Sequence, residues 1–114
     1  MTHSLRFMRP ELARVLEDIR FKRERQIHVH GWTLQHDSDE HSGGELAQAA
    51  IVHLQTAFRE VFHLADEETT IWWPWDESMP EELQRRLFAQ TKREALVNAA
   101  ALLVAELELL DRLT

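Results

Sequence analysis

The chain has 114 residues, no cysteine and a net charge of −7. A chain of this length suits one domain, which we expect to span residues 1–114, and the lack of cysteine excludes disulfides and thiolate metal sites. The acidic balance argues against broad, sequence-independent binding to DNA or RNA, which relies on a basic surface.

A first helix is predicted from near Pro10 to near Gly31, because proline is tolerated in the first helical turn and glycine often ends a helix. An apolar stripe follows the proline at helical spacing and consists of Leu12, Val15, Leu16 and Ile19. Residues 1–30 carry seven Lys/Arg and four Asp/Glu, whereas the rest of the chain is acidic. The basic residues would either pair internally or form an anion-binding patch.

The second half of this helix carries side chains that suit a phosphate. Arginine can hold a phosphate oxygen pair through two parallel hydrogen bonds. We therefore take Arg23, Arg25 and Gln26 as candidate ligand contacts. The alternative is a solvated helix end, because the helix dipole also favours basic residues near a C-terminus.

The polar stretch GWTLQHDSDEHSGGELAQAA, residues 31–50, follows the first helix. Its imidazole and carboxylate groups are suitable metal ligands, and they belong to His36, Asp37, His41 and Glu45. Their spacing matches no strong metal motif, so we predict no metal and no cofactor here. We interpret the four residues as one wall of a pocket for an anionic ligand. A purely structural loop is the alternative.

The second helix is predicted to begin at a capping box, in which Ser42 precedes Glu45 by three residues. Apolar residues at steps of three and four then predict one continuous face, formed by Leu46, Ala50, Leu54, Ala57, Val61 and Leu64.

The stretch TTIWWPWDES, residues 69–78, is predicted to be a loop around Pro74. Tryptophan offers a large apolar face that stacks on bases or cations. We take Trp73 and Trp75 as candidate ligand contacts. The alternative is that these rings pin the loop to the rest of the protein.

A short third helix is predicted from Pro80 to about Phe88. A further capping box, Thr91 to Glu94, predicts the start of the last helix, although the third helix could also continue through it. The last helix, residues 94–113, is apolar nearly all round, which is typical of a helix that is buried centrally or shared with another subunit. We therefore predict an all-α fold, a compact bundle of about four helices, and expect a homo-oligomer.

Glu106 interrupts the apolar run of the last helix. A buried carboxylate is usually paired with a cation. Alternatively, Glu106 and Glu45 on another helix could hold Mg²⁺ through water molecules.

Three stretches resemble a family of small uncharacterised phage and prophage proteins: KRERQIHVHGWTLQHDSDEHSGGELAQAA, WPWDES and REALVNAAALLVAELELLDR. The resemblance covers residues 22–112 and includes a Gly-Trp-Thr…His-Asp…His…Gly-Glu-Leu-Ala pattern and a Trp-Pro-Trp motif. Ser38 stands where the family has a second aspartate, and Asn98 where it has lysine. The resemblance implies no activity, but it implies a viral protein in the cytoplasm of a host cell. The chain has neither a membrane-length apolar run nor a signal-peptide core, which fits that location.

Three kinds of function remain open. We expect a binding protein without enzymatic activity that sequesters a host nucleotide-type ligand, such as a cyclic nucleotide immune signal, and so counteracts host defence. The alternatives are a metal-dependent all-α nucleotide pyrophosphohydrolase, in which carboxylates bind Mg²⁺ and activate water, and an acidic protein that inhibits a host complex. The paired Glu-x-x-Glu and Glu-x-x-Asp helices of such hydrolases are absent in that order.

Overall fold

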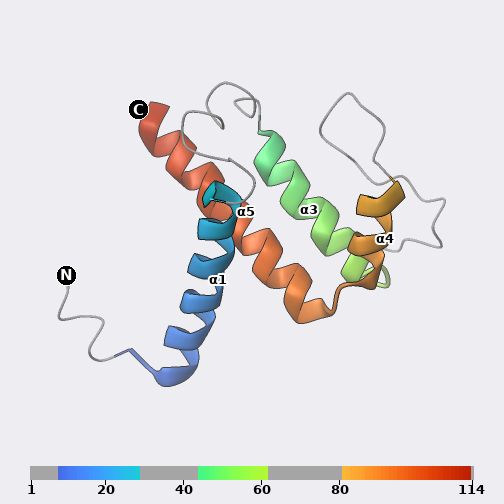
Figure 1. The fold of residues 1–114 in the computed structure, drawn as a ribbon, viewed down its shortest axis with the longest axis horizontal. Coiled ribbons are helices and arrows are strands. Elements are labelled where there is room, and N and C mark those ends of the chain that lie inside the picture. The colour runs from blue at the N-terminus through green and yellow to red at the C-terminus, as the bar shows by residue number, and fades with distance from the viewer. Residues whose placement is uncertain (1–7, 29–43, 62–80, 114) are drawn as a thin grey trace.

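Local signals in the chain account for where most of the helices begin. The structure is a computed structural model that describes residues 8–28, 44–61 and 81–113. Within these ranges it contains four helices and no strand: α1 (Pro10–His28), α3 (Glu45–Ala57), α4 (Glu81–Ala89) and α5 (Lys92–Leu113). The predicted all-α bundle is confirmed (Figure 1). None of these helices combines the length and apolar character that a membrane crossing requires.

Helix α1 begins at Pro10, as predicted, and the first backbone bond runs from the Ala13 N–H to the Arg9 carbonyl at 3.0 Å. Its apolar stripe lies on the same helical face as Arg23 and Gln26, which are buried. The N-terminal half of α1 extends away from α3 and α5 (Figure 1). The predicted stripe therefore lies on the correct face, but the bundle leaves much of it exposed, namely Leu12, Val15 and Leu16.

The predicted start of the second helix is wrong in its details. Helix α3 begins at Glu45 with Gly44 as its N-cap, and no side chain makes a capping hydrogen bond. A Ser42–Glu45 box would have placed Glu45 three residues inside the helix; Ser42 itself lies outside the described residues. Gly44 adopts φ 91, a left-handed conformation that glycine tolerates without steric cost, and this backbone turn sets the helix start.

The predicted apolar face of this helix is correct in its first half and wrong in its second. Leu46 and Ala50 are buried and Leu54 packs against them. The helix ends at Ala57 because Phe58 leaves helical geometry at φ −122 and ψ 49. Val61 is consequently outside the helix and exposed, and Leu64 lies outside the described residues. The Phe58 ring lies under the Lys92 ammonium at 5.6 Å, so a contact with α5 accompanies this early end.

The capping box before α5 is confirmed. The Thr91 hydroxyl accepts a hydrogen bond from the Glu94 N–H at 3.0 Å, and the Glu94 carboxylate accepts one from the Thr91 N–H at 2.9 Å. The hydrogen bond from the Thr91 N–H holds the pKa of Glu94 below its usual value. This reciprocal cap separates α4 from α5, so the alternative of one continuous helix is wrong.

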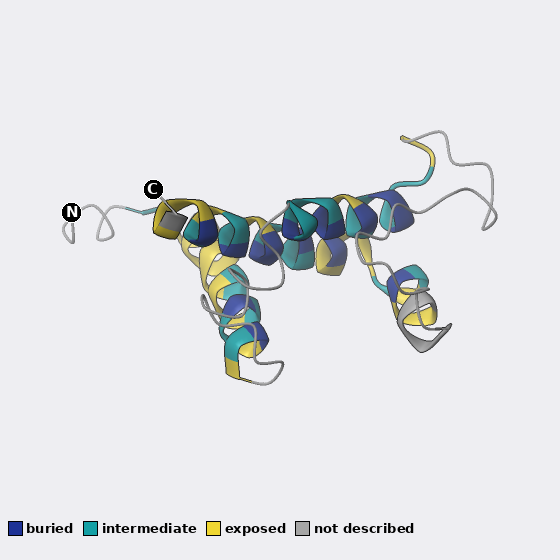
Figure 2. Ribbon diagram, turned by 90° about the horizontal axis from the view of Figure 1, so that it is seen from above, coloured by how far each residue is buried: buried dark blue, intermediate teal, exposed yellow. Residues whose placement is uncertain are grey.

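Close packing of α3 on α5 makes the core. Four alanines of α5 are buried, Ala95, Ala99, Ala101 and Ala105, as are Leu102 and Leu109; Ala99, Leu102, Ala105 and Leu109 belong to the cluster with α3. The small alanine side chains allow the two helices to approach closely, and Leu46, Ala49 and Ala50 of α3 fill the facing positions. Because α5 contacts both α1 and α3, the predicted central position is confirmed. Figure 2 shows that each helix nevertheless keeps an exposed side.

A polar network ties α3 to the turn between α4 and α5. Gln90 Nε2 lies 3.1 Å from His53 Nδ1, and Asn98 donates to Gln90 Oε1 at 2.9 Å. Burial lowers the pKa of His53 below its ordinary value of 6.5; the Gln90 hydrogen bond opposes this shift, and the nearby charge of Lys22 adds to it. Burial within the helix packing therefore favours the neutral form of His53.

We expect Thr91→Ala to lower the free energy of unfolding by about 1 kcal/mol, because it removes the hydroxyl that caps α5. Urea denaturation followed by circular dichroism measures the difference. Thr91→Ser keeps the hydroxyl and should remain close to the wild-type protein. Equal losses in both variants would show that the hydroxyl is not the capping group.

We expect the stability of the protein to fall as the pH drops below 6.5, in part because of His53. The lowered pKa means that the unfolded chain takes up the His53 proton at a higher pH than the folded chain, so protonation favours unfolding in that window. His53→Gln should reduce the slope of unfolding free energy against pH between about pH 7 and pH 5. An unchanged slope, measured by urea denaturation, would contradict the role of His53.

Candidate functional site

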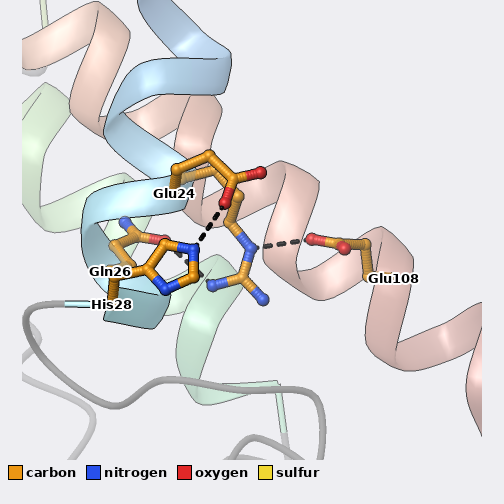
Figure 3. A network of polar contacts seen from close by, with 5 residues as sticks. Glu24, Gln26, His28 and Glu108 are labelled. Carbon is orange, nitrogen blue, oxygen red and sulfur yellow. Dashed lines mark hydrogen bonds and ion pairs between the residues drawn. The ribbon is translucent and has the colours of Figure 1, made fainter.

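Two arginines with contrasting surroundings dominate the polar interior. The first is Arg23, on the second half of α1, whose side chain is 5% exposed. Its Nε donates to Glu108 Oε1 of α5 at 2.7 Å, and its Nη1 donates to Gln26 Oε1 at 3.3 Å (Figure 3). A buried guanidinium is stable only when an anion and further acceptors surround it. Arg23 therefore joins α1 to α5.

The structure brings together only part of the predicted basic patch. Arg23 and Gln26 lie side by side and are buried, whereas Arg25 lies on the exposed side of the same helix. Glu24 and His28 form an exposed pair at 3.1 Å (Figure 3). The sequence left open whether the basic residues of this helix pair within the protein, and Arg23 does so. A ligand that binds here would have to share the Arg23 guanidinium with Glu108.

Glu45 and Glu106 come from different helices and lie at the same end of the bundle. Glu45 is the first residue of α3 and is partly exposed. A Cβ built on the neighbouring Gly44 would lie 4.0 Å from Glu106 Oε1 of α5. The Glu106 carboxylate therefore sits near the positive end of the α3 dipole, where a negative charge is stabilised. Among the described residues, no group of three or more His, Cys, Asp or Glu side chains is assembled for a metal.

The remaining predicted site residues, His36, Asp37, His41, Trp73 and Trp75, lie outside the described residues. Their assignment to a ligand pocket stays a prediction. The first three occur in the chain between His28 and Gly44, which end and begin the described ranges.

The second arginine, Arg59, was not among the predicted site residues. It follows α3, and its guanidinium carbon lies 5.2 Å from the centre of the Phe88 ring of α4. Both terminal nitrogens, Nη1 and Nη2, are buried, and within the described ranges neither has a hydrogen-bond partner. A cation over an aromatic face is attracted to it, but the ring supplies no acceptor for the guanidinium hydrogens.

Gln55, four positions earlier in the chain, also carries a buried polar atom without a partner among the described residues. It is 8% exposed, and its Oε1 is buried without a hydrogen-bond donor among the described residues. Gln55 lies on α3, four positions before Arg59 in the chain, and α3 packs against α4, the helix that carries the aromatic partner of Arg59. Buried polar atoms are nearly always hydrogen-bonded in native proteins. Around the C-terminal end of α3, buried groups of both kinds, Gln55 Oε1 and the Arg59 terminal nitrogens, have no hydrogen-bond partner among the described residues.

The signal that could have identified Arg59 is weak in the sequence. A basic residue just after an apolar helical pattern is commonly explained by the helix dipole. Gln55 four residues earlier is the only local sign of a polar face. The aromatic partner, Phe88, is 29 positions further along the chain and becomes apparent only in the fold.

Comparison with known proteins adds nothing to the description of this site. No family model, no curated protein and no solved structure matches the chain.

Proposed function

We propose that this protein captures an anionic small molecule of the nucleotide type and holds it without converting it. The observation that carries the proposal is the guanidinium of Arg59, with both terminal nitrogens buried and no hydrogen-bond acceptor among the described residues. An uncompensated cation in a protein interior is costly. A phosphate or carboxylate that accepts two parallel hydrogen bonds from it would remove that cost and gain a strong charge-assisted contact.

The surroundings of Arg59 suit the rest of such a ligand. The Phe88 ring lies against the guanidinium. The side-chain amide oxygen of Gln55, Oε1, can accept a hydrogen bond from a hydroxyl or amino group. Arg23 is less suitable as the anion receptor because its Nε already donates to the Glu108 carboxylate and its Nη1 to Gln26. In this proposal Trp73 and Trp75 stack the base, and His36, Asp37 and His41 contact the ligand, as predicted from the sequence.

The biological part of the proposal follows from the resemblance to phage and prophage proteins. A phage protein in the host cytoplasm that sequesters a nucleotide immune signal would counteract host defence. We further propose that the chain acts as a homo-oligomer, since the last helix has the apolar character of a subunit interface.

Hydrolysis of the ligand is the second candidate, and the proximity of Glu106 to the start of α3 favours it. Glu45 and Glu106 would then hold Mg²⁺ through water molecules. Chromatography of nucleoside triphosphates after incubation with Mg²⁺ separates the two functions. Capture leaves the nucleotide intact, whereas product that disappears in Glu45→Ala or Glu106→Ala would support hydrolysis.

We expect isothermal titration to find a ligand among inorganic phosphate, nucleoside phosphates, cyclic nucleotides and cyclic ADP-ribose isomers. Arg59→Met should weaken its binding by roughly tenfold or more, because the charge-assisted hydrogen bonds are lost. Arg14→Met is the matched control, since it removes an exposed arginine of α1 that is not a candidate ligand contact, and should change the affinity by no more than about twofold. No binding across the panel, or equal losses in the two variants, would contradict the proposal.

The two buried arginines should respond oppositely to the same substitution in the absence of ligand. Arg23→Met breaks the pair with Glu108 and should lower the free energy of unfolding by about 2 kcal/mol. Arg59→Met removes a cation whose buried terminal nitrogens have no acceptor among the described residues, so the unfolding free energy should stay unchanged or rise by about 1 kcal/mol. Thermal and urea denaturation measure both. A marked loss of stability in Arg59→Met would assign Arg59 a structural role instead.

A further inference from the structure

Helix α5 carries a row of exposed leucines, Leu96, Leu103, Leu107 and Leu110, called here the leucine row. Their exposed fractions are 50%, 45%, 60% and 52%. Leu96, Leu103 and Leu110 are spaced by seven residues, and Leu107 lies between the last two. Isolated exposed leucines are ordinary on protein surfaces, but steps of seven, four and three on one helix are the pattern of a coiled-coil seam. The row is therefore a candidate helix-packing surface.

The leucine row is separate from the side of α5 that packs inside the protein. Three of its members each follow a buried residue by one position: Ala95, Leu102 and Leu109 are buried and precede Leu96, Leu103 and Leu110. One position is about 100° around an α-helix. Helix α5 thus has two apolar sides, of which α3 covers one.

The charges at the ends of the leucine row favour one orientation of a partner helix. Arg93 and Asp111 are both exposed and stand 18 residues apart, which is about five full turns, so they flank the row on the same side. In an antiparallel pair of identical helices, equivalent sides face each other. Arg93 of each copy then lies near Asp111 of the other copy. In a parallel pair, Arg93 would instead lie near Arg93, and Asp111 near Asp111.

We infer that the leucine row is the interface of an antiparallel homodimer. This inference rests on the proposed self-association and is independent of the ligand. Leu103 of one copy packs against Leu103 of the other, and Leu96 packs against Leu110. Arg93, which also donates to Asp18 at 2.6 Å, contributes the positive charge at each end of the interface. The charge complementarity and the seam spacing together identify a second copy of this chain as the occupant.

Cysteine cross-linking tests the orientation directly, because the chain contains no cysteine of its own. Leu103→Cys alone should form a disulfide-linked dimer under mild oxidation. Leu96→Cys alone should remain unlinked, whereas a mixture of Leu96→Cys and Leu110→Cys should form the mixed dimer, because only facing positions lie within disulfide distance. Efficient linkage of Leu96→Cys to itself, or failure of both expected links, would overturn the inference.

Sedimentation velocity of the full chain tests the surface without cross-linking. The wild-type protein should dimerise between low micromolar and submillimolar concentration. Leu107→Glu should weaken the dimer by roughly a hundredfold, because it places a charge in an apolar interface. Phe21→Glu is the matched control, since Phe21 is 58% exposed on α1, and should dimerise like the wild type. Circular dichroism establishes that each variant is folded.

The outcomes separate two failures. A wild-type chain that stays monomeric throughout refutes the proposed self-association and this inference with it. A dimer that survives Leu107→Glu, or that Phe21→Glu disrupts equally, leaves self-association intact and shows that the leucine row is not its interface. Ligand titration of the same samples reports on capture separately, because Arg59 is not on α5.

Discussion

An ion pair between the buried guanidinium of Arg23 and the partly exposed carboxylate of Glu108 anchors α1 to the rest of the protein. The core proper is formed by α3 and α5, whose alanines and leucines interlock. Helix α1 brings much less apolar surface to this core, because its leucines and valine extend past it. A guanidinium held by a carboxylate and an amide oxygen takes the place of apolar packing here. Hydrogen bonds of this kind are directional, so they define the position of α1 more strictly than apolar packing alone would.

Arg23 and Arg59 differ in the partners that the described residues give to their guanidinium groups. Both guanidiniums are removed from water at their nitrogens. Arg23 has one acceptor on its own helix and one on α5, whereas Arg59 has an aromatic ring and no acceptor among the described residues. A protein whose stability is only a small difference between large opposing terms gains little from an unmatched charge. In the proposed function, an anionic ligand supplies the acceptor that the described residues do not provide for Arg59.

The sequence predicted the helices better than their ends, and the ends better than the site. Pro10, the Thr91–Glu94 box and the period of apolar residues are local signals, and each placed a helix correctly. The start of α3 was misplaced because a left-handed glycine, and not a serine, sets it. The predicted second helix extended past the observed end of α3, because the spacing of apolar residues does not show that the backbone turns at Phe58.

The candidate site was harder to predict because its chemistry lies between helices. Arg23 and Gln26 were selected for their side-chain type, but the acceptor that decides the role of Arg23 is 85 positions away. Arg59 had no distinguishing neighbour in the sequence, and it stands out because its buried terminal nitrogens have no acceptor within residues 8–28, 44–61 and 81–113. Pairing of this kind follows from tertiary geometry, which neither composition nor spacing encodes in a single sequence.

The projecting first half of α1 has a consequence for how the molecule moves. Helices of that length are marginal when nothing packs against them, and among the contacts described there are mainly local ones such as the exposed Glu17–Arg20 pair. Amide hydrogens near Pro10 should therefore exchange with solvent through local fraying, while those near Arg23 exchange only when the ion pair opens. The two halves of α1 should therefore exchange their amide hydrogens by different opening reactions, with the boundary where α1 contacts α5.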